Sequence, residues 1–288
     1  MEKITSLLFK TNAFKICEPN KPFWYTSGKI GPYFINAQYL YGSEKESNDL
    51  LDFINSQLEN ETKENIAKNV FEKVKTQYET NEIYKVVVDE LVESIKENID
   101  IDEIDFISGG ERRDWFFSMI IAYLLNKPHI TIFKDVTAVE STPDFTTNTM
   151  KSNLDNKNVL HIADLLNQAS SYIRAWIPAI ENLGGKLKWT ALAVDRMQGG
   201  TEVLEKENIK TITLIKIDEK LFEKAKELGI INQEQLEMLL NFKKDPDGTM
   251  KKFVHENPQF IKDSLNSDEK TAKRAQLCLD SNFYDIKI

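Results

Sequence analysis

The sequence has 288 residues, which is enough for one large domain or two ordinary ones. Apolar residues make up 41% and charged residues 29%, which excludes disordered, collagen-like and fibrous chains. The net charge of −9 argues against non-specific nucleic-acid binding, because phosphate contacts need clustered Lys and Arg, although a small basic pocket for a phosphorylated small molecule is compatible with it.

The first section, residues 1–42, is aromatic and rich in turn residues. Strands are predicted at Phe23–Tyr25 and Tyr33–Ala37, because aromatic and β-branched residues cluster there. Gly and Pro between them, at 27–32, predict a turn. We therefore expect residues 1–42 to form a small N-terminal subdomain.

The second section, residues 43–99, has the pattern of helices. Ile66, Val70 and Val74 recur every four residues, which places them on one face of a helix. No Pro or Gly interrupts the section. We expect a helical insert that serves as scaffold or as a dimer surface.

The third section, residues 100–217, alternates between strand and helix patterns. Short apolar runs predict strands at 104–107, 129–133, 158–163, 189–194 and 211–217. Helices are predicted at 115–125, 171–183 and 201–207, and a long polar loop at 134–157. This order predicts an α/β fold with a doubly wound, mostly parallel sheet, which binds ligands at the carboxyl ends of its strands.

The last section, residues 218–288, is charged and helical in pattern. Asp245–Gly248 is predicted to form a turn within it. We expect a helical C-terminal extension, whose role the sequence leaves open.

The sequence has no pattern typical of a membrane, secreted or metal-binding protein. No apolar run reaches about 18 residues, so no membrane span is expected, and the N-terminus lacks the pattern of a secretory signal. Cys17 and Cys278 lie at opposite ends, which favours a reduced, cytoplasmic protein. The three histidines are scattered, so a protein-caged metal site is not expected. His161, in the middle of a predicted strand, is interpreted as a buried structural residue.

Four segments carry polar residues at the ends of predicted strands. They are Phe23–Asn36, Asp105–Asp114, Val159–Ser171 and Ala193–Gly200. In order and spacing they resemble the orotate phosphoribosyltransferases, a branch of the type I phosphoribosyltransferase family. The first is similar to that family's N-terminal Ser-Gly-x-x-Ser-Pro-Tyr segment and the second to its pyrophosphate-binding turn. The third occupies the place of its phosphoribosyl pyrophosphate (PRPP) motif, and the last is similar to its Asp-Arg segment.

The resemblance implies an enzyme that transfers phosphoribosyl from PRPP to a nitrogenous base, with orotate as the first candidate. It implies Mg²⁺, bound mainly through the pyrophosphate of PRPP, and a homodimer. Small molecules are the expected partners, without nucleic acid or membrane.

The chain departs from the family pattern in two places. The family's PRPP motif has two adjacent acids and a Gly-containing turn, whereas this chain has Ala163 before Asp164 and no Gly in 167–171. The family's mobile loop carries Lys and His residues that neutralise the departing pyrophosphate, whereas no Lys-x-His follows Lys134. The first departure affects how closely a phosphate approaches the backbone, and the second affects transition-state stabilisation.

By resemblance, Lys134 and Asp164 are the candidate catalytic residues. The candidate substrate-binding residues are Lys29, Phe34, Arg112, Arg113, Asn167, Gln168, Ser170, Ser171 and Arg196. Guanidinium groups suit pyrophosphate because they bind phosphate oxygens in pairs. Hydroxyl, amide and backbone N–H groups at a helix N-terminus suit the 5′-phosphate.

Each candidate also has a plain structural alternative. Asp164 and the serines could be turn or capping residues. The two arginines could pair within a charged turn, and Arg196 could pair with the adjacent Asp195. Phe34 could be a core aromatic residue and Lys29 a surface lysine.

Two functions from different classes therefore remain. The first is catalysis of phosphoribosyl transfer. The second is a non-catalytic protein of the same fold that binds or senses a nucleotide, PRPP or a base, which the departures in the PRPP motif and the loop favour. A fold alone does not carry a function.

Overall fold

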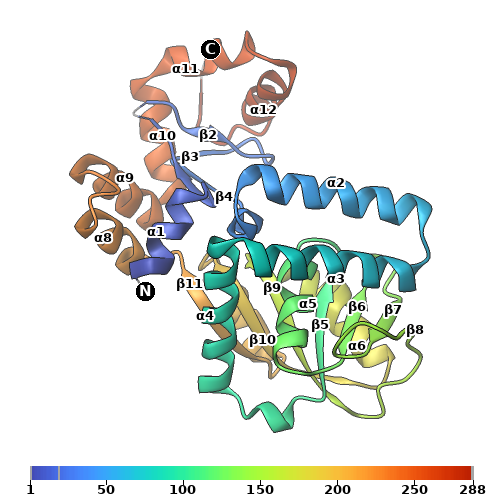
Figure 1. Ribbon diagram of the computed structural model, residues 1–288. Helices are drawn as coiled ribbons and strands as arrows, with labels where there is room; N and C mark the ends of the chain where they lie inside the picture. Colours follow the sequence, from blue (N-terminus) through green and yellow to red (C-terminus); the bar gives the residue numbers. More distant parts are fainter. Residues whose placement is uncertain (1, 19, 287–288) are drawn as a thin grey trace. The chain divides into compact units, whose positions relative to one another are not determined.

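The computed structural model describes residues 2–18 and 20–286 (Figure 1). The chain divides into two compact units. One comprises Ala37–Asp218, and the other joins Ile4–Asn36 to the residues from Glu219 onward. The sequence alone divides the chain at residues 42, 99 and 217, whereas in the structure the N-terminal segment and the C-terminal helices share one unit.

The first unit is built on a seven-stranded sheet with the order β11-β10-β9-β5-β6-β7-β8. Its strands are β5 (Phe106–Gly110), β6 (His129–Ile132), β7 (Ala138–Ser141), β8 (Asn148–Met150), β9 (Asn158–Leu166), β10 (Lys186–Asp195) and β11 (Lys210–Lys216). The pairs from β11 to β6 are parallel, and β7 and β8 are antiparallel. The predicted mostly parallel sheet is therefore confirmed.

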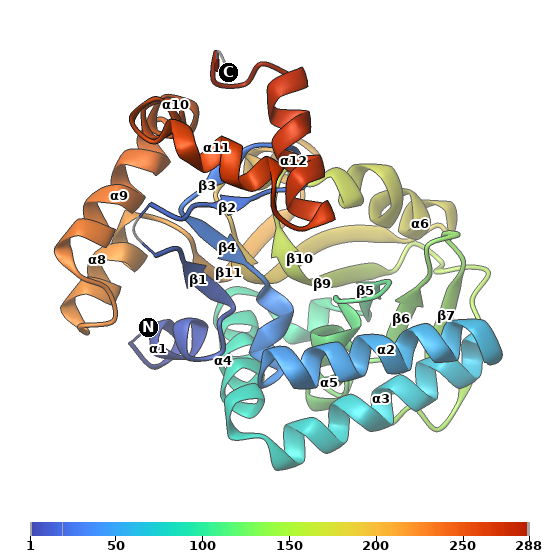
Figure 2. The ribbon, with the colours of Figure 1, turned by 90° about the horizontal axis from the view of Figure 1, so that it is seen from above.

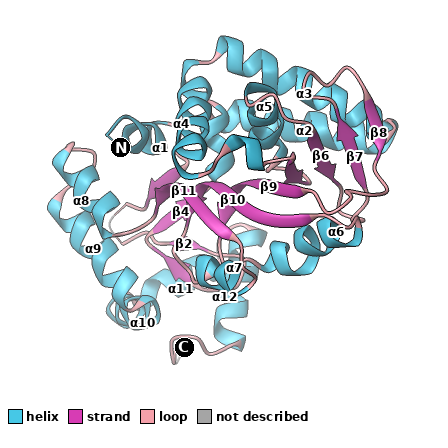
Figure 3. Cartoon of the chain, turned by 90° about the horizontal axis from the view of Figure 1, so that it is seen from below, coloured by secondary structure: helices cyan, strands magenta, loops and turns pink. Residues whose placement is uncertain are grey.

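Helices cover both faces of this sheet. They are α2 (Glu44–Asn60), α3 (Lys63–Thr80), α4 (Glu82–Asn98), α5 (Trp115–Leu124), α6 (Ile177–Asn182) and α7 (Gly200–Lys206), with shorter helical turns η1 (Ala37–Tyr41), η2 (Ile101–Glu103) and η3 (Tyr172–Trp176). Figure 3 shows α3, α4 and α5 on one side of the strands and α6 and α7 on the other. This two-sided cover is the doubly wound arrangement expected from the sequence.

The predicted helical insert is confirmed as α2, α3 and α4. Each begins at a residue whose side chain accepts a backbone N–H bond, namely Ser43, Thr62 and Asn81. Apolar side chains four residues apart on α3 are buried, as the periodicity predicts. The insert also contacts the sheet region directly, because the Lys63 ammonium on α3 binds Asp135 and lies 2.5 Å from the Thr137 hydroxyl.

The predicted long loop at 134–157 is wrong in its middle. Ala138–Ser141 and Asn148–Met150 pair as the hairpin β7–β8, and β7 also pairs with β6. Val139 and Ala138 are fully buried. The polar composition of the segment concealed this hairpin, since an edge strand needs few apolar side chains while its backbone bonds come from its neighbours.

The second unit combines short strands with the C-terminal helices (Figure 2). Its elements are α1 (Glu2–Lys10), β1 (Phe14–Ile16), β2 (Phe23–Trp24), β3 (Ile30–Gly31), β4 (Tyr33–Ile35), α8 (Glu219–Glu227), α9 (Gln233–Lys244), α10 (Pro246–Glu256), α11 (Pro258–Leu265) and α12 (Glu269–Asp280). Aromatic contacts join its parts, with Phe14 and Tyr33 stacked at 5.0 Å and Tyr33 edge-on to Phe242 at 5.5 Å.

The turn predicted at Asp245–Gly248 is instead the start of a helix. Asp245 is the N-cap of α10, and its side chain accepts the Gly248 N–H bond at 2.9 Å. Pro246 is the first helical residue, where its missing N–H costs nothing. Turn and N-cap share the same residue types, so composition alone does not separate them.

The sheet and η3 are joined by a buried hydrogen-bonded pair that offers a test of the fold. The Tyr172 and Thr190 hydroxyl oxygens lie 2.6 Å apart, and Thr190 donates to the His161 carbonyl at 3.0 Å. We expect Tyr172→Phe to lower the free energy of unfolding by about 1–2 kcal/mol, because a buried bond is lost while the ring stays. Urea unfolding would measure it, with the exposed Tyr123→Phe as the control. Equal stability of both variants would contradict this packing.

Among the helices of residues 2–18 and 20–286, none is long and apolar enough to cross a membrane.

Candidate active site

The carboxyl ends of β9 and β10 lie side by side in the first unit. Asp195 is paired in register with Leu166, and the Arg196 N–H donates to the Leu166 carbonyl at 3.0 Å. A Cβ added to Gly200 would lie 2.5 Å from the Asn167 carbonyl oxygen, so the two turns touch. The sequence segments 164–171 and 193–200 therefore meet at one edge of the sheet, where α/β folds bind ligands.

Asp164 lies within β9 rather than in a turn or at a helix cap. Its residue surface is 8% exposed, and its backbone N–H donates to Asp114 Oδ1 at 3.2 Å. The other oxygen of Asp114 accepts the Gly110 N–H bond at 3.2 Å and lies 3.4 Å from His161 Nε2. Two carboxyl groups and an imidazole are thus buried together beneath the turn.

This burial shifts the acidity of Asp164. Desolvation first, and the neighbouring Asp114 carboxylate second, raise the pKa of Asp164 from 3.8 to about 7, whereas the Arg113 guanidinium opposes the rise. Burial also raises the pKa of the adjacent Tyr172 well above 10. A carboxyl with this pKa can exchange a proton near neutral pH.

The turn after β9 leads directly into a helix. Asn167, Gln168, Ser170 and Ser171 are all exposed, while Ala169 between them is buried. Ala169 has φ of +57°, a left-handed conformation that glycine adopts without strain. The first N–H groups of the helix have no intrahelical acceptors, so the turn presents backbone donors beside these side chains. The predicted residues are together here, in a geometry suited to a phosphate.

The two arginines after β5 differ in their surroundings. The Arg112 guanidinium donates to the Asn55 side chain of α2, so the helical insert holds it. Arg113 is exposed, and its charge opposes the rise in the pKa of Asp164. Arg113 is therefore the arginine better placed for a ligand at the end of β9.

Lys134 follows β6 and has a mostly exposed side chain. Its side chain is 69% exposed, and its ammonium lies 3.8 Å from Glu111 Oε1. The Lys134 backbone N–H donates to the other oxygen of Glu111 at 3.1 Å. The turns after β5 and β6 are thus linked through Glu111, and the lysine side chain extends from this link.

Arg196 is half-buried beside the turn after β9. The adjacent Asp195 is engaged elsewhere, since its oxygens accept the Met197 N–H bond at 2.7 Å and the Thr201 hydroxyl at 2.9 Å. Among the described residues, no acceptor lies within hydrogen-bond distance of the buried Arg196 Nε. The structure therefore does not contain the local Asp195–Arg196 pair, and Arg196 Nε is left as an unsatisfied buried donor.

Two predicted residues, Lys29 and Phe34, belong to the second unit. The Lys29 ammonium lies 2.8 Å from both oxygens of Asp247 and 5.3 Å from the centre of the Phe283 ring. Phe34 is 39% exposed on β4, so it is not a core aromatic residue. Their roles in binding a base stay predictions.

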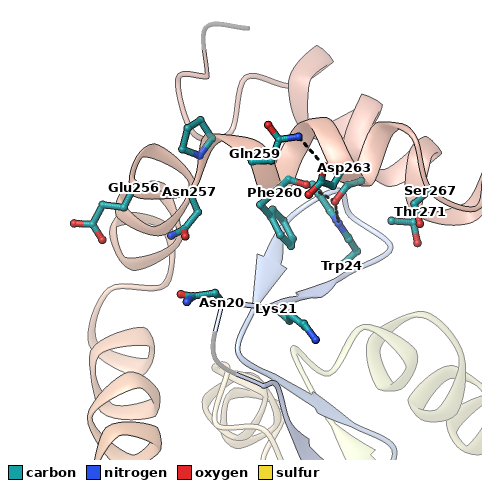
Figure 4. Close-up of a pocket in the computed structure, with 12 residues that line it drawn as sticks. Asn20, Lys21, Trp24, Glu256, Asn257, Gln259, Phe260, Asp263, Ser267 and Thr271 are labelled. Carbon is teal, nitrogen blue, oxygen red and sulfur yellow. Dashed lines mark hydrogen bonds between the residues drawn. The ribbon is translucent and has the colours of Figure 1, made fainter.

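The second unit also contains a pocket of about 660 Å³ (Figure 4). Trp24 and Phe260 line it with their rings stacked at 5.6 Å, and the Trp24 indole donates to the Ser264 hydroxyl at 3.0 Å. None of the predicted site residues is among the described residues that line it.

Sequence reasoning missed Asp114 as a site residue. It lies in the turn after β5, next to the arginines that were singled out, and 50 positions before Asp164. Its position directly before an apolar helix was the available signal, but such an Asp usually caps the helix; here its side chain makes no cap bond to α5. The interpretation of His161 as buried agrees with the structure, where Ser108 Oγ lies 2.9 Å from its Nδ1.

Comparison with known proteins finds similarity to phosphoribosyltransferases. No family model matches the sequence. An adenine phosphoribosyltransferase of Actinobacillus pleuropneumoniae is 29% identical over 176 residues, covering 57% of this chain and 96% of that protein. An orotate phosphoribosyltransferase of Sulfolobus acidocaldarius is 28% identical over 139 residues, covering 48% of this chain and 65% of that protein.

Solved structures show the same fold. UMP synthase of Leishmania donovani aligns with a TM-score of 0.55 and 15% identity over 84% of this chain, which spans 41% of that protein. The orotate phosphoribosyltransferase of Francisella tularensis aligns with a TM-score of 0.52 and 16% identity, covering 83% of this chain and 96% of that one. The resemblance to type I phosphoribosyltransferases, which are enzymes, is therefore confirmed, and the fold is theirs.

Proposed function

We propose that this protein is a phosphoribosyltransferase of the orotate type, which joins a nitrogenous base to PRPP and releases pyrophosphate. The observation that carries the proposal is the arrangement at the end of β9. There the buried Asp164, the exposed turn 167–171 and the unpartnered Nε of Arg196 lie at one sheet edge. Carboxyl, phosphate-binding and anion-binding groups are what a sugar phosphate and an acidic base together require.

Each group has a role in this proposal. The 5′-phosphate binds the turn 167–171, where Ser170, Ser171 and the backbone donate. Asp164 accepts the ribose hydroxyl bonds. Arg113 and Lys134 face the pyrophosphate and stabilise the charge that develops on it as the glycosidic bond forms. The transition state of the proposed reaction is oxocarbenium-like. The protein acts on it mainly by positioning the two substrates.

The proposal includes Mg²⁺ bound through the pyrophosphate of PRPP. In residues 2–18 and 20–286, no group of three or more His, Cys, Asp or Glu side chains is placed to cage a metal. Both oxygens of Asp114 already accept backbone N–H bonds. The fit is therefore to a cation carried by PRPP oxygens and water, which would neutralise the leaving group.

The comparisons include both orotate and adenine enzymes, so they do not decide the base. Arg196 favours a base that carries a carboxylate, because a guanidinium pairs with two carboxylate oxygens and the adjacent Asp195 is bonded to Met197 and Thr201 instead. Adenine offers no such group. Orotate is therefore the proposed base.

Arg196→Ala tests this choice. We expect kcat/KM for orotate to fall by about 10- to 100-fold, because one charged hydrogen-bonded pair is lost. Arg196→Lys should recover only part of it, since an ammonium cannot bind a carboxylate in the same planar geometry. Steady-state kinetics with orotate, adenine and other bases at saturating PRPP would measure both variants. Turnover of adenine by the wild type, unchanged by Arg196→Ala, would contradict the orotate proposal.

A specific observation favours the second candidate, a non-catalytic binding protein. Residues 138–141 and 148–150 are paired as the hairpin β7–β8 and so do not form a free loop, and Lys134 is the one Lys, Arg or His between β6 and β7. Calorimetry with PRPP and Mg²⁺, together with a turnover assay over a panel of bases, separates the two functions. Binding without turnover of any base would support the binding protein.

The homodimer and the cytoplasmic location stay part of the proposal. Sedimentation of a species of 33.3 kDa, the mass of one chain, would contradict the dimer.

A further inference from the structure

The turn after β5 brings a second carboxyl to Asp164. Asp114 Oδ1 accepts the Asp164 N–H bond at 3.2 Å and Oδ2 accepts the Gly110 N–H bond at 3.2 Å. Its side chain is 11% exposed. Asp114 therefore ties the ends of β5 and β9 together at the point where the site opens.

Other polar side chains surround the carboxyl groups of Asp114 and Asp164. His161 Nε2 lies 3.4 Å from Asp114 Oδ2 and, among the described residues, has no hydrogen-bond partner, although the imidazole is fully buried. The charge of Arg113, beside Asp114 in the β5 turn, and the Tyr172 hydroxyl of η3 interact electrostatically with Asp164. The charged and titratable groups around Asp164 are therefore Arg113 and Asp114 from the β5 turn, His161 from β9 and Tyr172 from η3.

The position of Asp114 bears on the missing first acid of the PRPP motif. Where the resembling family has two adjacent acids, this chain has Ala163 and Asp164, and Ala163 packs into the apolar core. The second carboxyl beside Asp164 is present in the structure, but it comes from a different strand.

We propose that Asp114 is a positioning residue for Asp164, which supplies from the β5 turn the carboxyl that β9 lacks at Ala163 and fixes Asp164 toward the ribose of PRPP. The proposal rests on the proposed function. Asp114 acts through Asp164 in two ways: it holds the Asp164 backbone by the N–H bond, and its negative charge favours the protonated form of the Asp164 carboxyl.

The test compares Asp114→Asn with a matched control at the opposite end of the same strands. Asp105 Oδ2 accepts the Asn158 N–H bond at 2.8 Å, so it also bridges β5 and β9 through a backbone N–H but lies away from Asp164. Asp105→Asn removes a comparable charge and bond. Asp114→Ser is a second variant that also removes the charge, so the test does not depend on a single substitution folding.

Two readouts are made on each folded variant. Carboxyl ¹³C NMR titration, which needs no substrate, should show the pKa of Asp164 falling by about one unit or more in both Asp114 variants, because a like charge is removed. It should not move in Asp105→Asn. Calorimetry with PRPP and Mg²⁺ at pH 8 should show affinity about fivefold or more weaker in the Asp114 variants, as the loss of one hydrogen bond of about 1 kcal/mol implies.

The two possible failures are distinguishable. A pKa of Asp164 that is unchanged in the Asp114 variants, or a PRPP affinity within about twofold of wild type, overturns the role of Asp114. A wild-type protein that binds no PRPP overturns the proposed function instead, and the titration still reports whether the two carboxyls interact.

Discussion

Asp164→Asn is expected to lower turnover of PRPP by about 10²- to 10³-fold, the loss typical of removing one preorganised polar group from an active site. The amide has nearly the same shape, but one of its two atoms can no longer accept a hydrogen bond. Because Asp164 is 8% exposed and held by Asp114, water cannot replace the lost acceptor. Steady-state assays with saturating orotate and varied PRPP would measure the change.

The same substitution should stabilise the fold at alkaline pH. The pKa of Asp164 is about 7 in the folded chain, against 3.8 for an ordinary Asp. A carboxyl whose pKa is raised by folding costs stability, because the unfolded chain ionises before the folded one. The cost is absent below about pH 4, grows between about pH 4 and 7, and is constant above that. Asp164→Asn removes it. Urea unfolding at pH 5 and pH 8 should therefore show the variant gaining on the wild type at pH 8.

Opposite effects on activity and stability would identify Asp164 as a site residue rather than a structural one. A variant that keeps full turnover, or one that loses turnover because it is less stable at both pH values, would contradict this role.

Ser171→Glu is expected to weaken binding of PRPP and of nucleoside monophosphates by about 100-fold. Ser171 is exposed at the start of the helix that follows β9, where the free N–H groups attract an anion. A carboxylate there occupies those donors and repels the 5′-phosphate; an unfavourable energy of about 3 kcal/mol between two such charges corresponds to this factor. Calorimetry with PRPP and Mg²⁺ would measure it.

Ser171→Gln is the matched control, since it has the size of Glu without the charge. We expect it to weaken binding only by about tenfold or less, through crowding and the loss of one hydroxyl donor. If Ser171→Glu binds PRPP as tightly as the wild type, the phosphate does not bind this turn.

Ala169→Gly should act in the opposite direction. Ala169 adopts φ of +57°, which an L-residue with a Cβ adopts at a cost of about 1–2 kcal/mol, and glycine removes that cost. The turn would also allow closer approach of a phosphate to its backbone. Tighter PRPP binding than wild type would fit the phosphate site, and weaker binding would count against it.

Individual elements show which parts of the fold could be predicted from the sequence. The recurrence of Ile66, Val70 and Val74 predicted α3, because helix periodicity is a local property that burial of one face reinforces. Apolar runs located β9 and β10 within a few residues. In contrast, β7 and β8 escaped prediction, since a short hairpin in a largely polar segment is held by backbone bonds to a neighbouring strand.

The sequence by itself determined the α/β class and the strands β5, β6, β9, β10 and β11 within residues 100–217, and it predicted the turn after β9 as the place for a phosphate. These depend on periodicity and on residues adjacent in the chain. Tertiary structure decided the partners: that Asp114 meets Asp164, that Arg196 Nε has no acceptor among the described residues while Asp195 bonds elsewhere, and that Ala169 is left-handed. Such contacts follow from strand register and packing, which join residues 50 positions apart, and no local pattern encodes that distance.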